Sequence, residues 1–163
     1  MRLTKLRATL LENDVDAILV SQPQNRRYLS GFTGSAGWLV ITTERAVMAT
    51  DFRYYEQVGR EAPGFELARI QTRVSDLLPE ILADLGIKRL GFESQHLTVE
   101  QLSTFSKEAE GVEWLPLENT VERIRAVKDQ DEIDALRRSA ALNDDAFAHL
   151  LEVIEPGMTE REA

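Results

Sequence analysis

The chain has 163 residues, of which 43% are hydrophobic and 29% charged, enough for one well-buried domain with a short extension. Its net charge of -9 is uneven: residues 1–62 carry eight Lys and Arg against seven Asp and Glu, whereas residues 63–163 carry eleven against twenty-one. The acidic second half argues against nucleic acid as a partner, because phosphate backbones need a clustered basic face.

Membrane and export signals are also missing from the sequence. No apolar run approaches the roughly 20 residues of a membrane helix, and residues 1–5 lack the apolar core of a signal peptide. The chain has no cysteine, which excludes disulfides and thiolate metal sites and is compatible with a reducing compartment. We therefore expect a cytoplasmic protein without membrane contact.

Three predicted elements begin the chain. An amphipathic helix is expected up to about Asn13, because leucines recur at helical spacing between charged residues. Residues 16–20 form a short apolar run that is typical of a buried strand. Residues 21–24 are interpreted as a turn, since Pro23 fixes its own φ and disfavours helix at the residue before it.

Residues 28–37 contain three glycines in ten positions. Glycines at this density permit positive φ and close backbone approach. The segment is either a tight structural connection that turns Phe32 into the core or a rim that touches a ligand. A phosphate-binding loop is not favoured, because the glycine spacing differs from that of a P-loop and no Gly-Lys-Ser/Thr follows.

Residues 38–49 predict a β-hairpin with its turn at Thr43-Glu44, which places the glycine-rich segment and Asp51 at one end of a sheet. A helix of about three turns is expected from residue 52. Asp51 is placed to cap that helix by accepting a hydrogen bond from a backbone N–H. Arg53 lies in the first turn, where the helix dipole disfavours a cation, so it needs a carboxylate partner inside the domain or in a ligand.

Helices and strands alternate through the rest of the first 118 residues. Further strands are expected at residues 65–70, 89–93 and 112–117, and further helices at residues 74–85 and 98–109. This order predicts an α/β fold with a mixed β-sheet flanked by helices. We assign residues 1–118 to this domain.

Residues 119–163 are assigned to an extension made of helices. The longer helix is expected to start at the capping pair Asp129 and Glu132 and to carry an apolar stripe from Ile133 to Ile154. We expect this stripe to pack partly against a missing domain, and in this chain either to pair with a second copy or to fray. A second capping-box pattern, Thr159 to Glu162, lies one residue before the last residue. Because a single turn of helix is unstable alone, we expect the chain to be part of a longer protein.

Three stretches closely resemble proline-specific metallopeptidases, the class that includes aminopeptidase P, prolidase and creatinase. They are Tyr28-Leu29-Ser30-Gly31-Phe32-Thr33-Gly34-Ser35, then Thr50-Asp51-Phe52-Arg53-Tyr54, and the tail segments Ile124-Arg125-Ala126-Val127-Lys128, Asp131-Glu132-Ile133 and Ile154–Glu162. The resemblance implies the N-terminal domain of that class, with its ribonuclease-H-like fold, followed by a C-terminal linker helix that leads into the catalytic "pita-bread" domain.

The resemblance also implies a function. The parent protein would hydrolyse the peptide bond before proline, in peptides with proline at the second position, with two divalent metal ions (Mn, Co or Zn) held in the absent C-terminal domain. This chain would be an accessory, oligomerisation and substrate-restricting domain without catalytic residues or metal ligands of its own. In a homodimer it would cover the partner's active site, with Arg53, Tyr28, Phe32 and Tyr54 orienting the peptide. Aminopeptidase, dipeptidase and creatinase-like substrates stay open.

Two alternatives from other functional classes remain. The chain could be a non-enzymatic interaction module that binds a partner through its long charged helix. It could also be a metal-dependent nuclease in which Asp51 and Glu93 converge at the ends of two strands. The two histidines do not have metal-ligand spacing; we expect His96 to be exposed before a helix and His149 to be partly buried within one.

Overall fold

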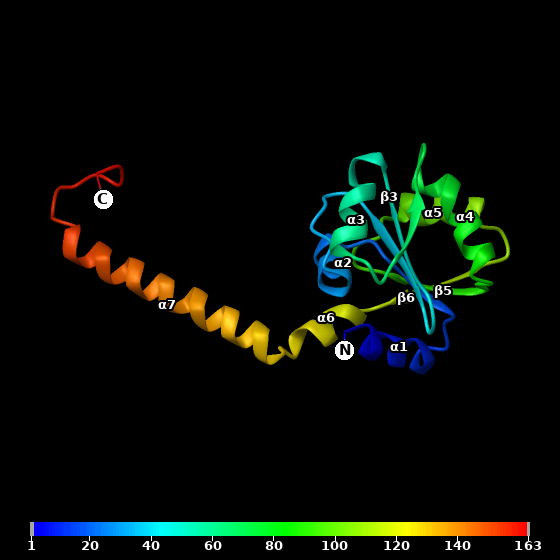
Figure 1. The fold of residues 1–163 in the computed structure, drawn as a ribbon, viewed down its shortest axis with the longest axis horizontal. Coiled ribbons are helices and arrows are strands. Elements are labelled where there is room, and N and C mark those ends of the chain that lie inside the picture. The colour runs from blue at the N-terminus through cyan, green and yellow to red at the C-terminus, as the bar shows by residue number, and fades with distance from the viewer. Residues whose placement is uncertain (1, 163) are drawn as a thin grey trace. The chain divides into compact units, whose positions relative to one another are not determined.

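The computed structural model describes residues 2–162. The chain divides into two compact units, Met1–Ala126 and Val127–Ala163. The first unit contains a six-stranded mixed sheet with helices on both faces, and the second contains one long helix (Figure 1). The predicted α/β class with a mixed sheet is confirmed.

The observed elements follow the predicted order, with one addition. The strands are β1 (Ala17–Val20), β2 (Trp38–Thr42), β3 (Ala46–Thr50), β4 (Glu66–Arg69), β5 (Arg89–Glu93) and β6 (Glu113–Leu117). The helices are α1 (Arg2–Glu12), α2 (Pro23–Ser30), the 3-10 turn η1 (Phe52–Tyr54), α3 (Tyr55–Glu61), α4 (Val74–Asp84), α5 (Val99–Glu108), α6 (Thr120–Ala126) and α7 (Gln130–Val153).

The strand order is β4-β3-β2-β1-β5-β6. β2 is antiparallel to both of its neighbours, and the other three neighbouring pairs are parallel. Five strands therefore run in one direction, and their last residues lie along one edge of the sheet, which we call the carboxyl edge. The two stretches of the first unit that resemble the peptidase family, residues 28–35 and 50–54, lie along this edge.

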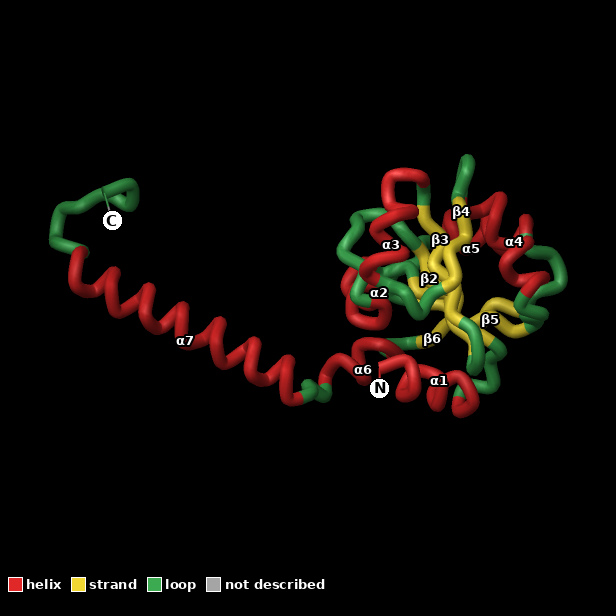
Figure 2. Tube along the Cα trace, in the orientation of Figure 1, coloured by secondary structure: helices red, strands yellow, loops and turns green. Residues whose placement is uncertain are grey.

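Two hydrophobic cores lie on opposite faces of the sheet. In β1, Ile18 and Val20 point into one core, whereas Ala17 and Leu19 point into the other. Helices α1, α2, α3 and α6 contribute side chains to the first core, and α4 and α5 contribute to the second (Figure 2). Because the central strands are covered on both faces, they are continuous apolar runs instead of alternating ones.

The helix α2 was not predicted, and the interpretation of residues 21–24 as a turn is wrong. Pro23 is the first residue of the helix, where its fixed φ fits and its missing N–H is not needed. Two of the three residues that α2 buries are Asn25 and Arg26, and the third is Leu29. Because polar side chains face inward, α2 shows no apolar stripe from which a helix could be recognised.

The helix α6 begins just beyond the predicted domain boundary at residue 118, and it packs against the first core of the sheet. Its Val121 and Ile124 are buried in the first core together with Leu6 and Leu10 of α1. The compact α/β unit therefore includes this helix and reaches residue 126.

The second unit is dominated by α7, whose start is closed by the predicted capping box. Asp129 accepts a hydrogen bond from the backbone N–H of Glu132, and Glu132 accepts one from that of Asp129. No residue of α7 is buried. Leu136, Phe147 and Leu151 of the predicted stripe are exposed, and so is Leu142, which lies outside the stripe. His149 is exposed as well, so its predicted partial burial is wrong.

Candidate functional site

The loop of residues 31–37, which connects α2 to β2, forms the centre of the carboxyl edge; we call it the glycine loop. The guanidinium of Arg26 holds it from inside, with Nη1 donating to the carbonyl oxygen of Gly37 (2.7 Å) and Nη2 to that of Gly34 (2.9 Å). Arg26 is buried, and burial lowers its pKa by penalising the charged form. A buried cation thus lies directly beneath the loop.

The outer side of the glycine loop is tied to α3. The Glu61 carboxylate accepts hydrogen bonds from the backbone N–H (2.8 Å) and the hydroxyl (2.9 Å) of Thr33. Gln57 donates to both Glu61 and Thr33. The pKa of Glu61 is lowered, mostly by the hydrogen bond from the backbone N–H of Thr33 and next by the hydrogen bond from the Gln57 side chain. With Thr50 donating to the Ala36 carbonyl (2.7 Å), the loop is fixed from three elements.

The aromatic side chains of Phe32 and Tyr54 pack edge to face beside the loop, with ring centroids 5.6 Å apart. Gly34 lies against both rings: a Cβ added there would overlap the Phe32 ring and come within 2.8 Å of Tyr54 Cδ1. The glycine at this position is therefore required by the close approach of backbone to aromatic rings, as the density of glycines suggested.

Arg53 is held on two sides. Asp51 binds it through two hydrogen bonds, Nε to Oδ1 (2.8 Å) and Nη2 to Oδ2 (2.7 Å), and its guanidinium lies 5.2 Å from the centre of the Tyr54 ring. These bonds lower the pKa of Asp51 and raise that of Arg53. The Tyr54 hydroxyl meets Ser35 Oγ at 2.7 Å, and this bond together with the charge of Arg53 lowers the tyrosine pKa.

Asp51 caps the first turn of the following helix, as predicted, by accepting from the backbone N–H of Arg53. The carboxylate partner that Arg53 was expected to need is Asp51 itself. The side chain of Arg53 nevertheless stays 55% exposed, so one edge of the guanidinium faces solvent. This exposed, doubly supported cation is the most accessible charged group of the cluster.

Of the four predicted substrate-contacting residues, the structure brings three together. Phe32, Tyr54 and Arg53 form one cluster, in which Phe32 is only 1% exposed and packs against Tyr54. The Phe32 ring lies in the core, and its role in binding a peptide stays a prediction. Tyr28 has other partners: it is half-buried on α2, and the Arg2 guanidinium lies 4.3 Å from its ring centre.

A second polar cluster lies where β1 and β5 end. Glu93 is buried and accepts from the backbone N–H groups of Ser21 (2.7 Å) and Gln22 (2.7 Å) at the start of α2, and from the Asn25 amide (2.6 Å). The α2 N-terminus stabilises the buried carboxylate through its dipole and free N–H groups. His96 is exposed, and its Nδ1 lies 2.9 Å from Ser21 Oγ.

Asp51 and Glu93 do not converge, so the predicted carboxylate pair is wrong. Two strands, β2 and β1, separate β3 from β5 in the sheet, which corresponds to about 14 Å at the usual strand spacing. Each carboxylate also has its own partners within the domain. Among residues 2–162 there is no group of three or more His, Asp and Glu side chains that could hold a metal ion.

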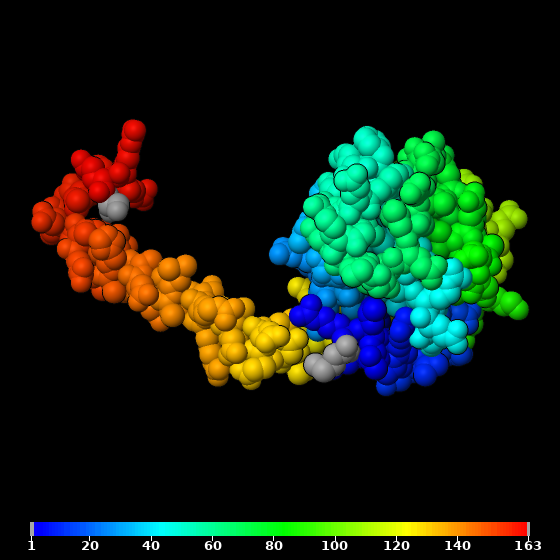
Figure 3. All heavy atoms as spheres, viewed as in Figure 1, coloured from blue at the N-terminus to red at the C-terminus, as the bar shows by residue number. Residues whose placement is uncertain are grey.

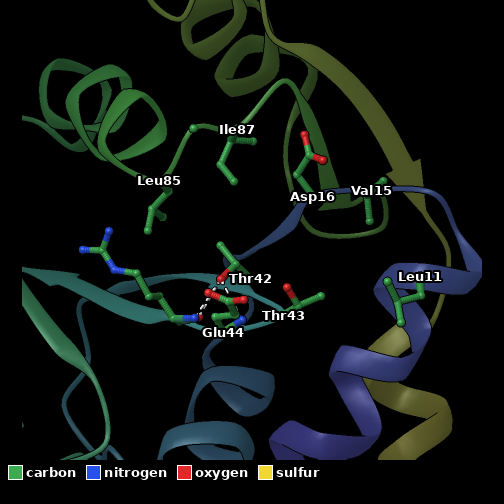
Figure 4. Close-up of a pocket in the computed structure, with 10 residues that line it drawn as sticks. Leu11, Val15, Asp16, Thr42, Thr43, Glu44, Leu85 and Ile87 are labelled. Atoms are coloured by element: carbon green, nitrogen blue, oxygen red, sulfur yellow. Dashed lines mark hydrogen bonds between the residues drawn. The ribbon is translucent and has the colours of Figure 1, made fainter.

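A separate hollow of about 370 Å³ lies at the opposite edge of the sheet (Figure 4). Apolar side chains of α1 and of the segments flanking β1 and β5 line it, together with the turn between β2 and β3. Within that turn, the Thr42 hydroxyl accepts from the backbone N–H groups of Glu44 and Arg45. Arg7 of α1, which does not line the hollow, donates to the Thr42 and Glu44 carbonyls. Figure 3 shows the turn, in cyan, against α1, in blue.

The sequence model of one protein family, the creatinase/prolidase N-terminal domain, matches residues 2–127. This range coincides with the α/β unit, including α6. The chain belongs to the creatinase/prolidase N-terminal domain family. The predicted resemblance is thereby confirmed.

Relatives of this creatinase/prolidase N-terminal domain are described as peptidases. The chain is 37% identical over 160 residues to an uncharacterized peptidase, YqhT, of Bacillus subtilis, covering 98% of this chain and 45% of the relative. It is 32% identical to a putative Xaa-Pro aminopeptidase of Mycoplasma pneumoniae, with 98% and 44% coverage. The chain thus spans less than half the length of these relatives.

Solved structures agree with this family assignment. An Xaa-Pro dipeptidase from Bacillus anthracis superposes with a TM-score of 0.92 at 37% identity, over 99% of this chain and 45% of that one. The N-terminal domain of the cytoplasmic peptidase PepQ from Mycobacterium tuberculosis superposes with a TM-score of 0.69 at 37% identity, over 75% of this chain and 96% of that one. The second case is a comparable domain determined by itself.

Several residues that hold the carboxyl edge of this sheet were not predicted from the sequence. Arg26 and Asn25 are buried although nothing in their polar neighbourhood indicates it. Glu61 lies near the end of a helix, 28 residues from Thr33, and no local pattern connects the two. The high density of glycines was the one signal that pointed to this loop.

No helix among the described residues is both long and apolar enough to cross a bilayer.

Proposed function

We propose that this chain is the first half of an Xaa-Pro peptidase, an enzyme that hydrolyses the peptide bond preceding proline. Family membership carries the proposal, together with relatives described as Xaa-Pro aminopeptidases and dipeptidases that are more than twice as long. In the complete protein the chain is an accessory domain, and bond cleavage takes place in the second half. The absence of cysteine and the description of one structural neighbour as a cytoplasmic peptidase support a cytoplasmic location.

The substrate-restricting surface is the exposed edge of the Arg53 and Tyr54 cluster. Asp51 and Tyr54 hold the guanidinium in one orientation, so little conformational entropy is lost when it binds a polar group of a peptide. Phe32 and Gly34 fix Tyr54 from behind. In a homodimer this surface narrows the cleft of the partner subunit, and Tyr28 on α2 lies outside the cluster.

The metal ions of such a peptidase belong to the second half. The described residues do not fit a two-metal site, because they provide no cluster of carboxylate and imidazole ligands. A dinuclear centre of Mn, Co or Zn would require ligands beyond residue 163. The residues of this chain supply binding and orientation only.

In this proposal the second half of the same protein covers the apolar stripe of α7. The stripe is exposed in the chain, and a structural match covering 99% of the chain extends across α7 in a protein more than twice as long. If the chain were instead a free-standing interaction module, the stripe would bind an unrelated partner. The parent sequence after residue 163 separates the two, since a peptidase requires spaced Asp, His and Glu ligands there.

The deciding experiment compares the full-length protein with residues 1–163. With added Mn²⁺, Co²⁺ or Zn²⁺, the full-length protein is expected to hydrolyse Xaa-Pro dipeptides or longer peptides with proline second, and residues 1–163 are expected to be inactive. Peptides with alanine in place of proline serve as the substrate control. Turnover by residues 1–163, or equal cleavage of both peptides by the full-length protein, would contradict the proposal.

A further inference from the structure

The ends of β1 and β5 form the point of the sheet where α/β folds usually open a crevice. The chain leaves β1 into α2, which packs on the first core, whereas it leaves β5 toward α5, which packs on the second core. Neighbouring parallel strands whose connections go to opposite faces create a ligand-binding crevice at their carboxyl ends. Here, polar side chains of α6 reach this position instead.

Asn25 is the centre of that contact, and both its amide nitrogen and its amide oxygen have hydrogen-bond partners. It is 0% exposed, and its Nδ2 donates to Glu93 Oε1 (2.6 Å) and to Glu122 Oε1 (2.5 Å). Its Oδ1 accepts from Arg125 Nη1 (2.8 Å). A side-chain amide has two hydrogens to donate. Both are used here, one for the carboxylate of Glu93 on the sheet and one for that of Glu122 on α6, so the amide bridges the two carboxylates.

The contact differs from ordinary packing because of its charges. Glu93 and Glu122 carry like charges, and the Asn25 amide lies between them. The guanidinium of Arg125 binds the other side of that amide. Glu93 also meets Ser21, whose hydroxyl contacts His96, and interacts electrostatically with Arg26. An amide can bridge two carboxylates, but a third carboxylate of the same shape cannot. The docking of α6 is therefore sensitive to one substitution that leaves the volume unchanged.

We propose that Asn25 is a positioning residue that locks α6 onto the carboxyl edge, and so fixes the point at which the chain leaves the α/β unit. Val121 and Ile124 bury the apolar side of α6, and Asn25 adds the directional contacts that select its orientation. This lock is a property of the chain itself. Only its consequence for catalysis, through the placement of the second half, rests on the proposed function.

The test is amide hydrogen exchange of residues 1–163, followed segment by segment and expressed as protection relative to the unfolded chain. Asn25→Leu keeps the size and removes every polar contact, so protection of α6 is expected to fall at least about tenfold while β1 to β5 change little. The same substitution at the exposed Asn143 of α7 is the matched control and is expected to leave α6 unchanged. If Asn25→Leu does not fold, Arg125→Met removes a single donor and is measured in the same way.

Asn25→Asp separates a lock built on charge from simple packing. At about pH 7 three carboxylates meet, so α6 protection is expected to fall about tenfold or more. As the pH decreases, one of the three carboxyls binds a proton and its single O–H replaces one of the two lost N–H donors, so protection is expected to recover in part. Asn25→Leu should show no such recovery. Unchanged α6 protection in Asn25→Leu, or equal protection of wild type and Asn25→Asp at neutral pH, would overturn the proposal.

The consequence for catalysis is tested separately in the full-length protein. Asn25→Leu is expected to lower kcat/KM for Xaa-Pro peptides several-fold while metal content stays unchanged. Loss of α6 protection without any change in kcat/KM would remove this consequence, whereas an inactive wild-type protein would argue against the proposed function and leave the lock standing on the exchange data.

Discussion

Phe32 and Tyr54 cross at an interplanar angle of 89°, and the backbone of Gly34 fits against both rings. This contact joins the two stretches that mark the family, because Phe32 belongs to the glycine loop and Tyr54 to the segment after β3. It fixes Tyr54, over whose ring Arg53 lies.

Gly34→Ala is expected to destabilise the α/β unit by about 1–3 kcal/mol, because the added methyl group overlaps the Phe32 ring in a packed core. Unfolding in urea measures the change. Gly59→Ala is the control: nothing lies within 4 Å of its added Cβ, and alanine in the α3 helix is expected to stabilise by about 0.5–1 kcal/mol. Equal effects of the two substitutions would refute the packing role of Gly34.

Arg53→Met in the full-length protein is expected to raise KM for Xaa-Pro peptides with little loss of folded protein, since the Arg53 side chain is half exposed and its ion pair lies at the surface. Steady-state kinetics and a thermal unfolding scan measure the two effects. Arg73→Met, at another exposed arginine paired with a neighbouring aspartate, is the control. A KM unchanged by Arg53→Met would exclude Arg53 from substrate binding.

Glu61 makes the glycine loop sensitive to acid. Its pKa is lowered in the folded state by the N–H of Thr33, so its contribution is complete above the ordinary glutamate value of 4.5 and is lost as the pH falls through the lower, folded value. We expect the melting temperature of wild type to fall more steeply below about pH 4.5 than that of Glu61→Gln.

The matched control for Glu61 is Glu80→Gln, at an exposed glutamate on α4. Its melting temperature should follow that of wild type through the acid range. Parallel curves for wild type and Glu61→Gln would show that the hydrogen bonds to Thr33 do not stabilise the fold.

The α/β unit is expected to fold without α7. A chain of residues 1–127 should unfold cooperatively within a few degrees of the melting temperature of residues 1–163, because the buried core lies entirely within the first unit. The stripe substitutions Leu136→Lys and Phe147→Lys in residues 1–163 should leave that temperature unchanged and reduce binding of a hydrophobic dye. A large loss of stability in the shorter chain would contradict this independence.

The sequence by itself determined the elements whose signals are local. Apolar runs gave the strands, the turn at Thr43-Glu44 gave the hairpin, and the capping pair gave the start of α7. It also identified the family, because three motifs occur in order along one chain.

Only the tertiary structure decided which polar groups meet. It buried Asn25 and Arg26 on a helix without an apolar stripe, paired Arg53 with Asp51, and separated Asp51 from Glu93 by two strands. It also placed the Phe32 ring in the core. The physical reason is that which hydrogen bonds and ion pairs form depends on how side chains are oriented and on which residues far apart in the sequence become neighbours once strand order is set. Local spacing carries the pattern of each helix and strand but not the order of the strands in the sheet.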